Sequence, residues 1–272
     1  MTPICVPSLG KAGKSSTLKL LLDEPGMIEN TYIFAYDFEV EAYTKAYPGA
    51  NVVNVGTTKN LPNKRNRILD YGKEQGWKKL LMIDDDIKGF VVKRIGEEKP
   101  ERLESFNEFI TIVEDIEDQL NDDYTVLCPR WNFISCDNIN EGNLLIEYSQ
   151  LANVFFFNLE KLGDMRFEQM SLEDIDMYIR LVLNGHKCYK LRQVQAYSTL
   201  AEDGGYQTYM DTTERYLGGI KQLHDKFEHS DSFIYATKQG FAGMRKPAFI
   251  KWLKEYHPDV ALHDIPKIKG VE

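Results

Sequence analysis

The feature that most constrains the fold is an apolar run, Lys79–Ile83, that ends in three consecutive carboxylates, Asp84, Asp85 and Asp86. An aliphatic run of this length predicts a strand buried on both faces. Because side chains alternate along a strand, we expect Asp84 and Asp86 on one face and Asp85 on the other. An isolated acidic triplet is also typical of a solvated loop. Its position favours a ligand site, since open α/β sheets bind ligands beyond the carboxyl ends of parallel strands.

Three adjacent anions repel one another unless a cation or a donor lies between them. Two carboxylates on one face suit a hard divalent cation such as Mg²⁺ or Mn²⁺, which in turn would hold a diphosphate. Asp84 and Asp86 are therefore the candidate metal ligands.

The composition indicates a protein with a full hydrophobic core and no membrane span. The 272 residues are 43% hydrophobic and 28% charged. No apolar stretch approaches the roughly 20 residues of a spanning helix, and Met1–Cys5 lacks the features of a signal peptide. We therefore expect a cytoplasmic location.

Charge and cysteine spacing exclude two classes of protein. A net charge of −9 argues against non-specific coating of nucleic acid, although a local basic surface remains compatible with it. The four cysteines form no CxxC pair, which predicts buried thiols and neither a zinc site nor a disulfide framework.

Strands and helices alternate along the first half of the chain. This alternation predicts βαβ units and a mostly parallel sheet. The expected strands are 3–7, 31–36, 51–55, 79–83, 124–128 and 154–157, and the expected helices are 18–22, 40–43, 62–71 and 103–120, with a loop over 93–102.

The loop after the first expected strand carries glycines and lysines between Ser8 and Thr17. Such a loop before a helix can receive phosphates on its backbone N–H groups. The P-loop pattern requires a glycine where this chain has Ser8. A P-loop-like nucleotide-binding module or NTPase nevertheless stays open as an alternative.

A basic cluster, Lys64-Arg65-Asn66-Arg67, lies near the start of the helix before the acidic strand. Cations at a helix start oppose the helix dipole. The cluster is either a solvated face or a contact for a diphosphate or sugar, which the arginine fork suits.

A second group of carboxylates, Glu173, Asp174 and Asp176, opens a helix for which we expect Ser171 as the N-cap and Gly185 as the terminator. These acids complement the helix dipole, which is a sufficient structural reason for them. A carboxylate presented at such a helix start can also act as a general base towards a hydroxyl.

The last third of the chain predicts a helix over 212–227 and a basic, aromatic stretch over 238–254. Such a stretch is either the surface of a lysine-rich helix or a place where DNA phosphates dock.

The order of these features resembles the GT-A nucleotide-sugar glycosyltransferases: a Pro-Ser loop, Arg65-Asn66, the acidic strand end and Glu173-Asp174. The resemblance implies that Asp84 and Asp86 hold a metal ion on the diphosphate of the donor. It implies Asp174 as the base, with Asp176 as the alternative and Glu173 beside them. The late histidine ligand of that family is absent here, and Asp203 or Ser198 is the candidate stand-in.

Within that superfamily the opening Val6–Lys14, the run Asn63–Asn66 and Gly204-Gly205 resemble the TET-associated glycosyltransferases, over roughly residues 1 to 210. These phage enzymes add a sugar to hydroxymethylated pyrimidines in DNA. The resemblance implies a UDP-sugar donor and double-stranded DNA containing hydroxymethylcytosine as the acceptor, with neither a membrane nor a stable protein partner. The implied donor contacts are Pro7, Ser8, Gly10, Lys11, Lys14, Asp37, Lys64, Arg65, Asn66 and Asp85.

We therefore predict an α/β protein with a GT-A domain, a Rossmann-like and mostly parallel sheet flanked by helices, over 1–210. A small helical extension over 211–272 packs on it. The predicted reaction is Mn²⁺- or Mg²⁺-dependent transfer of a sugar, arabinose or glucose among the candidates, to 5-hydroxymethylcytosine. A GT-A enzyme acting on a polysaccharide or protein is the nearer alternative.

Overall fold

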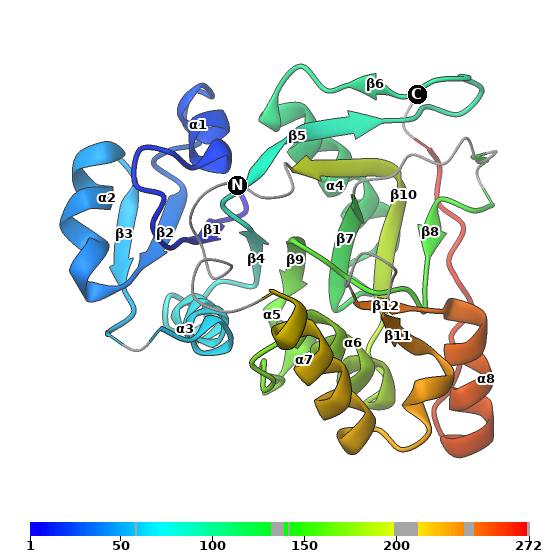
Figure 1. Ribbon diagram of the computed structural model, residues 1–272. Helices are drawn as coiled ribbons and strands as arrows, with labels where there is room; N and C mark the ends of the chain where they lie inside the picture. Colours follow the sequence, from blue (N-terminus) through cyan, green and yellow to red (C-terminus); the bar gives the residue numbers. More distant parts are fainter. Residues whose placement is uncertain (58, 132–138, 141, 199–211, 237–241, 271–272) are drawn as a thin grey trace.

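The computed structural model describes residues 1–57, 59–131, 139–140, 142–198, 212–236 and 242–270, without the side chains of residues 131 and 212–215. Its centre is a ten-stranded sheet in the order β3-β2-β1-β4-β9-β7-β10-β5-β6, with β8 paired to β10 (Figure 1). The strands are β1 Ile4–Pro7, β2 Thr31–Ala35, β3 Asn51–Asn54, β4 Lys79–Ile83, β5 Ile87–Val92, β6 Glu101–Arg102, β7 Val126–Trp131, β8 Leu145–Ile146, β9 Val154–Asn158 and β10 Cys188–Ser198.

Strands β1 to β4, β7 and β10 run in one direction. Parallel pairing joins β1 to β2 and β4, β2 to β3, and β7 to β10. Strand β9 lies antiparallel between β4 and β7. The predicted mostly parallel α/β sheet is thus confirmed, with β5, β8 and β9 as the strands that run the other way.

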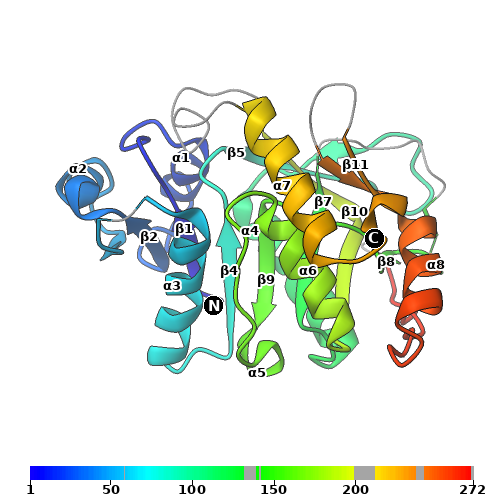
Figure 2. The same cartoon turned by 60° about the horizontal axis from the view of Figure 1, so that its bottom comes forward.

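Helices cover both faces of the sheet. On one face lie α1 Ser16–Leu22, α2 Val40–Ala46 and α4 Phe106–Leu120, whose apolar side chains share one core cluster. On the other face lie α3 Leu61–Glu74, α5 Leu159–Leu162, α6 Glu173–Leu183, α7 Thr212–Lys226 and α8 Lys246–Tyr256. Figure 2 shows α3, α6 and α7 in front of the sheet and α4 behind it.

Side chains alternate between the two faces of β4, and this alternation explains why Asp84 and Asp85 point to opposite sides of the sheet. Leu80 and Met82 belong to the core on the α3 face, and Leu81 and Ile83 belong to the core on the α1 face. The same period sends Asp84 towards α3 and Asp85 towards α1.

Local sequence accounts for the helix ends near the site. Asn60 caps α3 by accepting a hydrogen bond from the Asn63 N–H, and Pro62 occupies its first turn, where a missing N–H costs nothing. Gly185, at φ 75°, follows α6 as predicted. The predicted N-cap Ser171 is wrong, because Leu172 precedes α6 in the left-handed region at φ 59° and no side chain caps the helix.

The C-terminal segment contributes to the core on the α3 face. After α7 come a short 3-10 turn, η3 Ser230–Ser232, and a hairpin of β11 Ile234–Ala236 and β12 Ala242–Met244. Phe249 and Trp252 of α8 are buried in that core, so the predicted basic and aromatic surface loses these two rings; residues 238–241 of that stretch lie outside the described residues. The division into domains at residue 210 stays a prediction.

Six strands of the described residues were not predicted: β5 directly after Asp86, the eleven-residue β10, and the short β6, β8, β11 and β12. Of these, β6 lies within the expected loop over 93–102, whose end pairs with β5. Cys5, Cys128 and Cys188 are buried free thiols, as expected, and Cys136 lies outside the described residues. Among the helices of the described chain, none has the length and apolar character of a membrane span.

Candidate functional site

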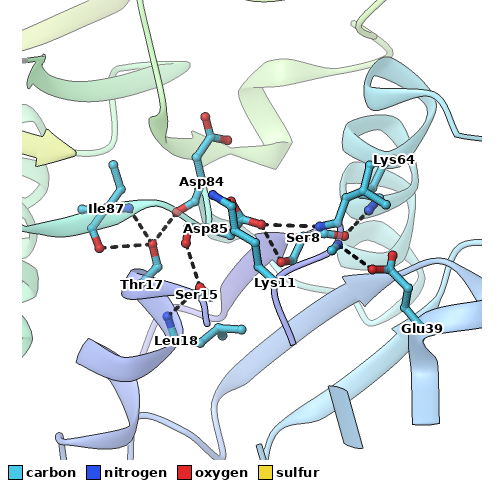
Figure 3. A network of polar contacts seen from close by, with 12 residues as sticks. Ser8, Lys11, Ser15, Thr17, Leu18, Glu39, Lys64, Asp84, Asp85 and Ile87 are labelled. Carbon is cyan, nitrogen blue, oxygen red and sulfur yellow. Dashed lines mark hydrogen bonds and ion pairs between the residues drawn. The ribbon is translucent and has the colours of Figure 1, made fainter. Parts of the chain in front are cut away.

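The candidate site lies where β1, β2 and β4 end, and its acidic turn has two sides. Asp85 faces the loop after β1 and helix α2, whereas the Asp84 carboxylate points the other way, as Figure 3 shows. We call the first side, made by Ser8, Lys11, Tyr43 and Asp85, the Asp85 network. We call the second side, made by Asp84, Asp86, Glu173 and Asp174 around Arg65, the carboxylate cluster.

The Asp85 network is buried and its hydrogen bonds are complete. The Ser8 hydroxyl donates to Asp85 Oδ2 at 2.5 Å, and Lys11 Nζ lies 3.0 Å from Asp85 Oδ1. Since Ser8 gives its only proton to Asp85, the Tyr43 hydroxyl donates to Ser8 Oγ, at 2.6 Å. Tyr43 also accepts from the Lys11 N–H at 3.1 Å, and burial raises the pKa of this hydroxyl.

Backbone oxygens of the acidic turn hold α1 in place. Ser15 Oγ donates to the Asp85 carbonyl at 2.8 Å, and Thr17 Oγ1 donates to the Asp84 carbonyl at 2.6 Å (Figure 3). Ser15 Oγ also accepts from the Leu18 N–H and so caps α1. The acidic turn and the loop after β1 therefore form one rigid unit.

Glu39 and Lys64 close the other side of this loop. The Gly10 N–H donates to Glu39 Oε1 at 2.5 Å, and the Lys64 ammonium donates to the Ser8 carbonyl. Lys64 is 1% exposed, and burial lowers its pKa to about 8 although Glu39 and Asp85 favour its charge. Glu39 and Tyr43 were not predicted, and the one signal for Glu39 was its place just after β2.

Arg65 joins the two acidic segments of the chain. Its Nη2 lies 3.0 Å from Asp84 Oδ1, and its Nη1 lies 3.4 Å from Glu173 Oε1. The guanidinium is buried against the rings of Phe155 and Phe167, with its carbon 5.2 and 5.4 Å from their centroids. The end of β4 and the start of α6 therefore meet at one buried cation.

Asp84, Asp86 and Asp174 hold protons more tightly than usual. Burial raises the pKa of Asp84 to about 6, against the lowering by Arg65. Burial and the charge of Asp84 raise the pKa of Asp86 to about 7. Burial and Glu173 raise the pKa of Asp174 to about 6, while Arg65 and Gln150 lower it. Repulsion between these anions is thus only partly balanced by Arg65.

Two of the predicted site residues, Asp176 and Asn66, use their side-chain polar groups in contacts with other parts of the protein. Asp176 is fully buried, with Arg180 Nη2 at 2.8 Å and Lys226 Nζ at 2.7 Å, so it ties α6 to α7 on the side away from Arg65. Asn66 uses both atoms of its amide on the backbone of Phe167. The roles assigned to both from sequence stay predictions.

The remaining predicted donor contacts differ in exposure. Pro7 is buried at the end of β1, whereas Gly10, Lys14 and Asp37 are exposed around the same loop. Asp37 Oδ1 accepts from Asn54 Nδ2 at 2.7 Å. These three residues are the parts of the predicted donor site that solvent reaches.

A metal ion has two carboxylates available here. Among the described residues no group of three His, Cys, Asp or Glu side chains could hold a metal ion. The predicted third ligand, Asp203, lies outside the described residues, and Ser198 ends β10. Gln150, whose Nε2 lies 3.3 Å from Asp174 Oδ2, belongs to the site and had no signal in the sequence.

The largely parallel α/β sheet, with carboxylates at the end of a central strand and at a nearby helix start, agrees with the GT-A fold predicted from the sequence. Residues 2–205 match the family model of the TET-associated glycosyltransferases. The chain belongs to this family, and it is a glycosyltransferase. No protein of curated function matches the sequence.

Solved structures resemble the chain at low identity. A cytidylyltransferase from Leptospira borgpetersenii serovar Hardjo-bovis is 15% identical, with a TM-score of 0.43 over 97% of this chain and 98% of that one. CMP:2-keto-3-deoxy-manno-octonic acid synthetase is 9% identical, with a TM-score of 0.46 over 83% and 98%. A putative nucleotide-diphospho-sugar transferase from Desulfovibrio desulfuricans G20 is 9% identical, with a TM-score of 0.39 over 74% and 83%. All three TM-scores are low, and the family match alone carries the assignment.

Proposed function

We propose that this glycosyltransferase moves a sugar from a UDP-sugar to the hydroxymethyl group of 5-hydroxymethylcytosine in DNA, with the help of a divalent cation. The observation that carries the proposal is the meeting of Asp84 and Glu173 on Arg65, at 3.0 and 3.4 Å. It brings a candidate metal-binding strand end next to Asp174, a candidate base. A metal-dependent transfer in which a general base takes the proton of the acceptor hydroxyl uses both.

The residues present fit a divalent cation. Asp86 Oδ1 is buried and has no hydrogen-bond partner in the described part of the chain. The negative charges of Asp84 and Asp86 repel each other, and a bound cation would relieve this repulsion. Mg²⁺ and Mn²⁺ sites commonly use one or two carboxylates and complete their shell with substrate phosphates and water, so a third protein ligand is not required. A bound ion would stabilise the negative charge that develops on the leaving diphosphate.

Asp174 suits the part of general base. Its pKa, raised to about 6, lies close to neutral pH, where a base is mostly ionised and still a good proton acceptor. Gln150 donates to its Oδ2 and orients the carboxylate. In this proposal the acceptor hydroxyl gives its proton to Asp174 as the sugar bond forms.

The exposed end of β2 supports a nucleotide donor. Phe38 is 57% exposed, and its ring stacks on Tyr36 with 5.8 Å between centroids. An exposed aromatic ring beside Asp37, at the carboxyl edge of the sheet, offers a planar base a stacking surface and a hydrogen-bond acceptor. The DNA acceptor rests on family membership.

The structure gives no support to the P-loop alternative. The Lys11 ammonium is paired with Asp85, and the N–H groups of Gly10, Lys11 and Ser15 bond to Glu39, Tyr43 and Tyr47. A phosphate cradle needs these groups to point at the ligand. Helix α1 begins with its first turn already capped by Ser15.

The decisive experiment offers a panel of UDP-sugars and Mn²⁺ with two duplexes that differ only in hydroxymethylcytosine against cytosine. We expect nucleoside mass spectrometry to show the mass of one sugar residue added to the hydroxymethylcytosine duplex alone, and no product in EDTA. If both DNA duplexes stay unmodified and a polysaccharide or protein receives the sugar, the nearer alternative, a GT-A enzyme acting on such an acceptor, is favoured. Hydrolysis of ATP without sugar transfer would overturn the proposal in favour of an NTPase.

A further inference from the structure

We propose that Asn66 is a positioning residue, which holds the start of α6 opposite the acidic end of β4 and so sets the distance between the metal site and the base. The inference rests on the proposed function for its catalytic consequence. It assigns Asn66 a part different from the donor contact that the sequence predicted.

The geometry of Asn66 is that of a backbone substitute. Its Nδ2 donates to the Phe167 carbonyl at 2.8 Å, and its Oδ1 accepts from the Phe167 N–H at 2.8 Å. Two such bonds copy the pairing of a β-strand and fix both the position and the direction of the chain at Phe167. This chain segment leads directly into α6.

Phe167 passes this constraint on to Arg65. The Phe167 ring is buried edge-on against the Phe155 ring, and both lie against the guanidinium, 5.4 and 5.2 Å from its carbon. With the rings fixed, the planar fork of Arg65 keeps one edge on Asp84 and the other on Glu173. Asn66 thus acts through Phe167 and Arg65 on both carboxylate groups.

A neighbouring pair of contacts supports the same arrangement. Arg166 Nη2 lies 2.7 Å from Asp70 Oδ1 of α3. Arg180 Nη2 of α6 donates to the Arg166 carbonyl. Helix α3 therefore holds the segment before α6 at two successive residues, and α6 is bound to the same segment.

The test compares Asn66→Asp with Asn158→Asp. Asn158 makes the same two kinds of bond, donating to the Asp122 carbonyl at 3.2 Å and accepting from the Lys161 N–H at 3.2 Å. It pairs with Lys79 at the start of β4, the end of the sheet remote from the site. The two variants place the same new charge against a main-chain carbonyl. Because Asn158 is also the N-cap of α5, where aspartate serves as well as asparagine, urea denaturation of both variants measures the folding effect of each.

For Asn66→Asp we expect kcat to fall roughly 10- to 100-fold, because a displaced base is costly, with the Kd of the UDP-sugar in calorimetry unchanged within about twofold. Asn158→Asp should keep its kcat. A donor Kd that rises tenfold or more with kcat kept would overturn the inference and restore the donor contact. Equal kcat losses in both variants would overturn the inference, because they would show that Asn66 has only a general structural role.

A second measurement needs no turnover. Hydrogen exchange of peptides that cover residues 163–176 should be at least about tenfold faster in Asn66→Asp than in Asn158→Asp. Equal exchange in the two variants would overturn the positioning role. If the unmodified protein fails to glycosylate hydroxymethylated DNA, the proposed function falls, and the exchange result still decides the part played by Asn66.

Discussion

The two sides of the acidic turn differ in how their charges are balanced. On the α1 side, Asp85 accepts a hydrogen bond from Ser8 Oγ at 2.5 Å and forms an ion pair with Lys11 Nζ at 3.0 Å. Ser8 and Lys11 have further partners of their own. On the α3 side, one guanidinium serves Asp84 and Glu173, and Asp86 and Asp174 lie beside them with raised pKa values. In the proposed function, Asp85 therefore stabilises the fold whereas Asp84 and Asp86 serve the reaction, and single substitutions can separate the two roles.

The largest effect is expected for Asp86→Asn. Loss of a metal ligand should lower turnover at least about 10³-fold and remove Mn²⁺-dependent binding of UDP. The melting temperature without metal should stay or rise, because repulsion from Asp84 is relieved. Calorimetry with UDP and Mn²⁺, beside a thermal melt, checks both points. Normal Mn²⁺-dependent binding would remove Asp86 from the metal site.

Asp174→Asn should lower turnover roughly 10²- to 10⁴-fold while the UDP-sugar still binds, because the proton acceptor is lost. Asp176→Asn, two residues away, is the matched control. It breaks the buried ion pairs with Arg180 and Lys226, so it should mainly destabilise the fold, by roughly 2–4 kcal/mol. Steady-state rates and urea denaturation on both variants separate the two roles. If the Asp176 variant loses the larger part of the rate, the base is Asp176.

On the other side of the turn, Asp85→Asn should cost stability. The buried Lys11 ammonium would lose its counter-ion, which destabilises the fold by roughly 3 kcal/mol. Asp37→Asn, an exposed carboxylate at the end of β2, should change the stability by less than about 0.5 kcal/mol. Urea denaturation of both variants measures the difference. An unchanged stability in Asp85→Asn would show that the Asp85 network is not structural.

A carboxylate at the far end of the sheet sharpens the comparison. Glu117 is 4% exposed beside Lys79, and burial raises its pKa to about 7. The folded state therefore binds this proton more tightly than the unfolded chain, whose pKa is near 4.5. Glu117 should therefore add roughly 1–2 kcal/mol to the stability as the pH falls from about 8 to about 5, besides the contributions of the other carboxylates with raised pKa values.

Glu117→Gln should flatten that pH dependence and leave turnover unchanged. Urea denaturation at several pH values, with rates at neutral pH, checks this outcome. A loss of turnover in Glu117→Gln would show that a raised pKa marks a functional residue in this protein even at a position remote from the carboxyl edge of the sheet.

The sequence predicted the acidic turn and its surroundings because local signals define them. The apolar run 79–83 and the alternation after it specify β4 and the opposite directions of Asp84 and Asp85. Strand β10 was missed because Lys190, Arg192 and Gln193 interrupt its apolar pattern. A strand between β5 and β7 tolerates these residues, but a single sequence does not reveal its neighbours.

The partners of Arg65 and Asn66 could not be predicted for a different reason. A helix start rich in cations indicates an anion, and in this chain the anions are Asp84 and Glu173 of the protein itself. The bond from Asn66 to Phe167 spans 101 residues. Sequence spacing carries no information about such a contact, because tertiary packing alone brings the two residues together.

The insertion of β9 between β4 and β7 has a consequence for biosynthesis. Residues 79–83 leave the ribosome well before residues 154–158, which cover one edge of β4 in the finished sheet. During that interval the most apolar strand of the sheet has an open edge, and open edges of this kind recruit other chains. A nascent chain that ends between these two strands is therefore the form of this protein most exposed to aggregation and most dependent on chaperones.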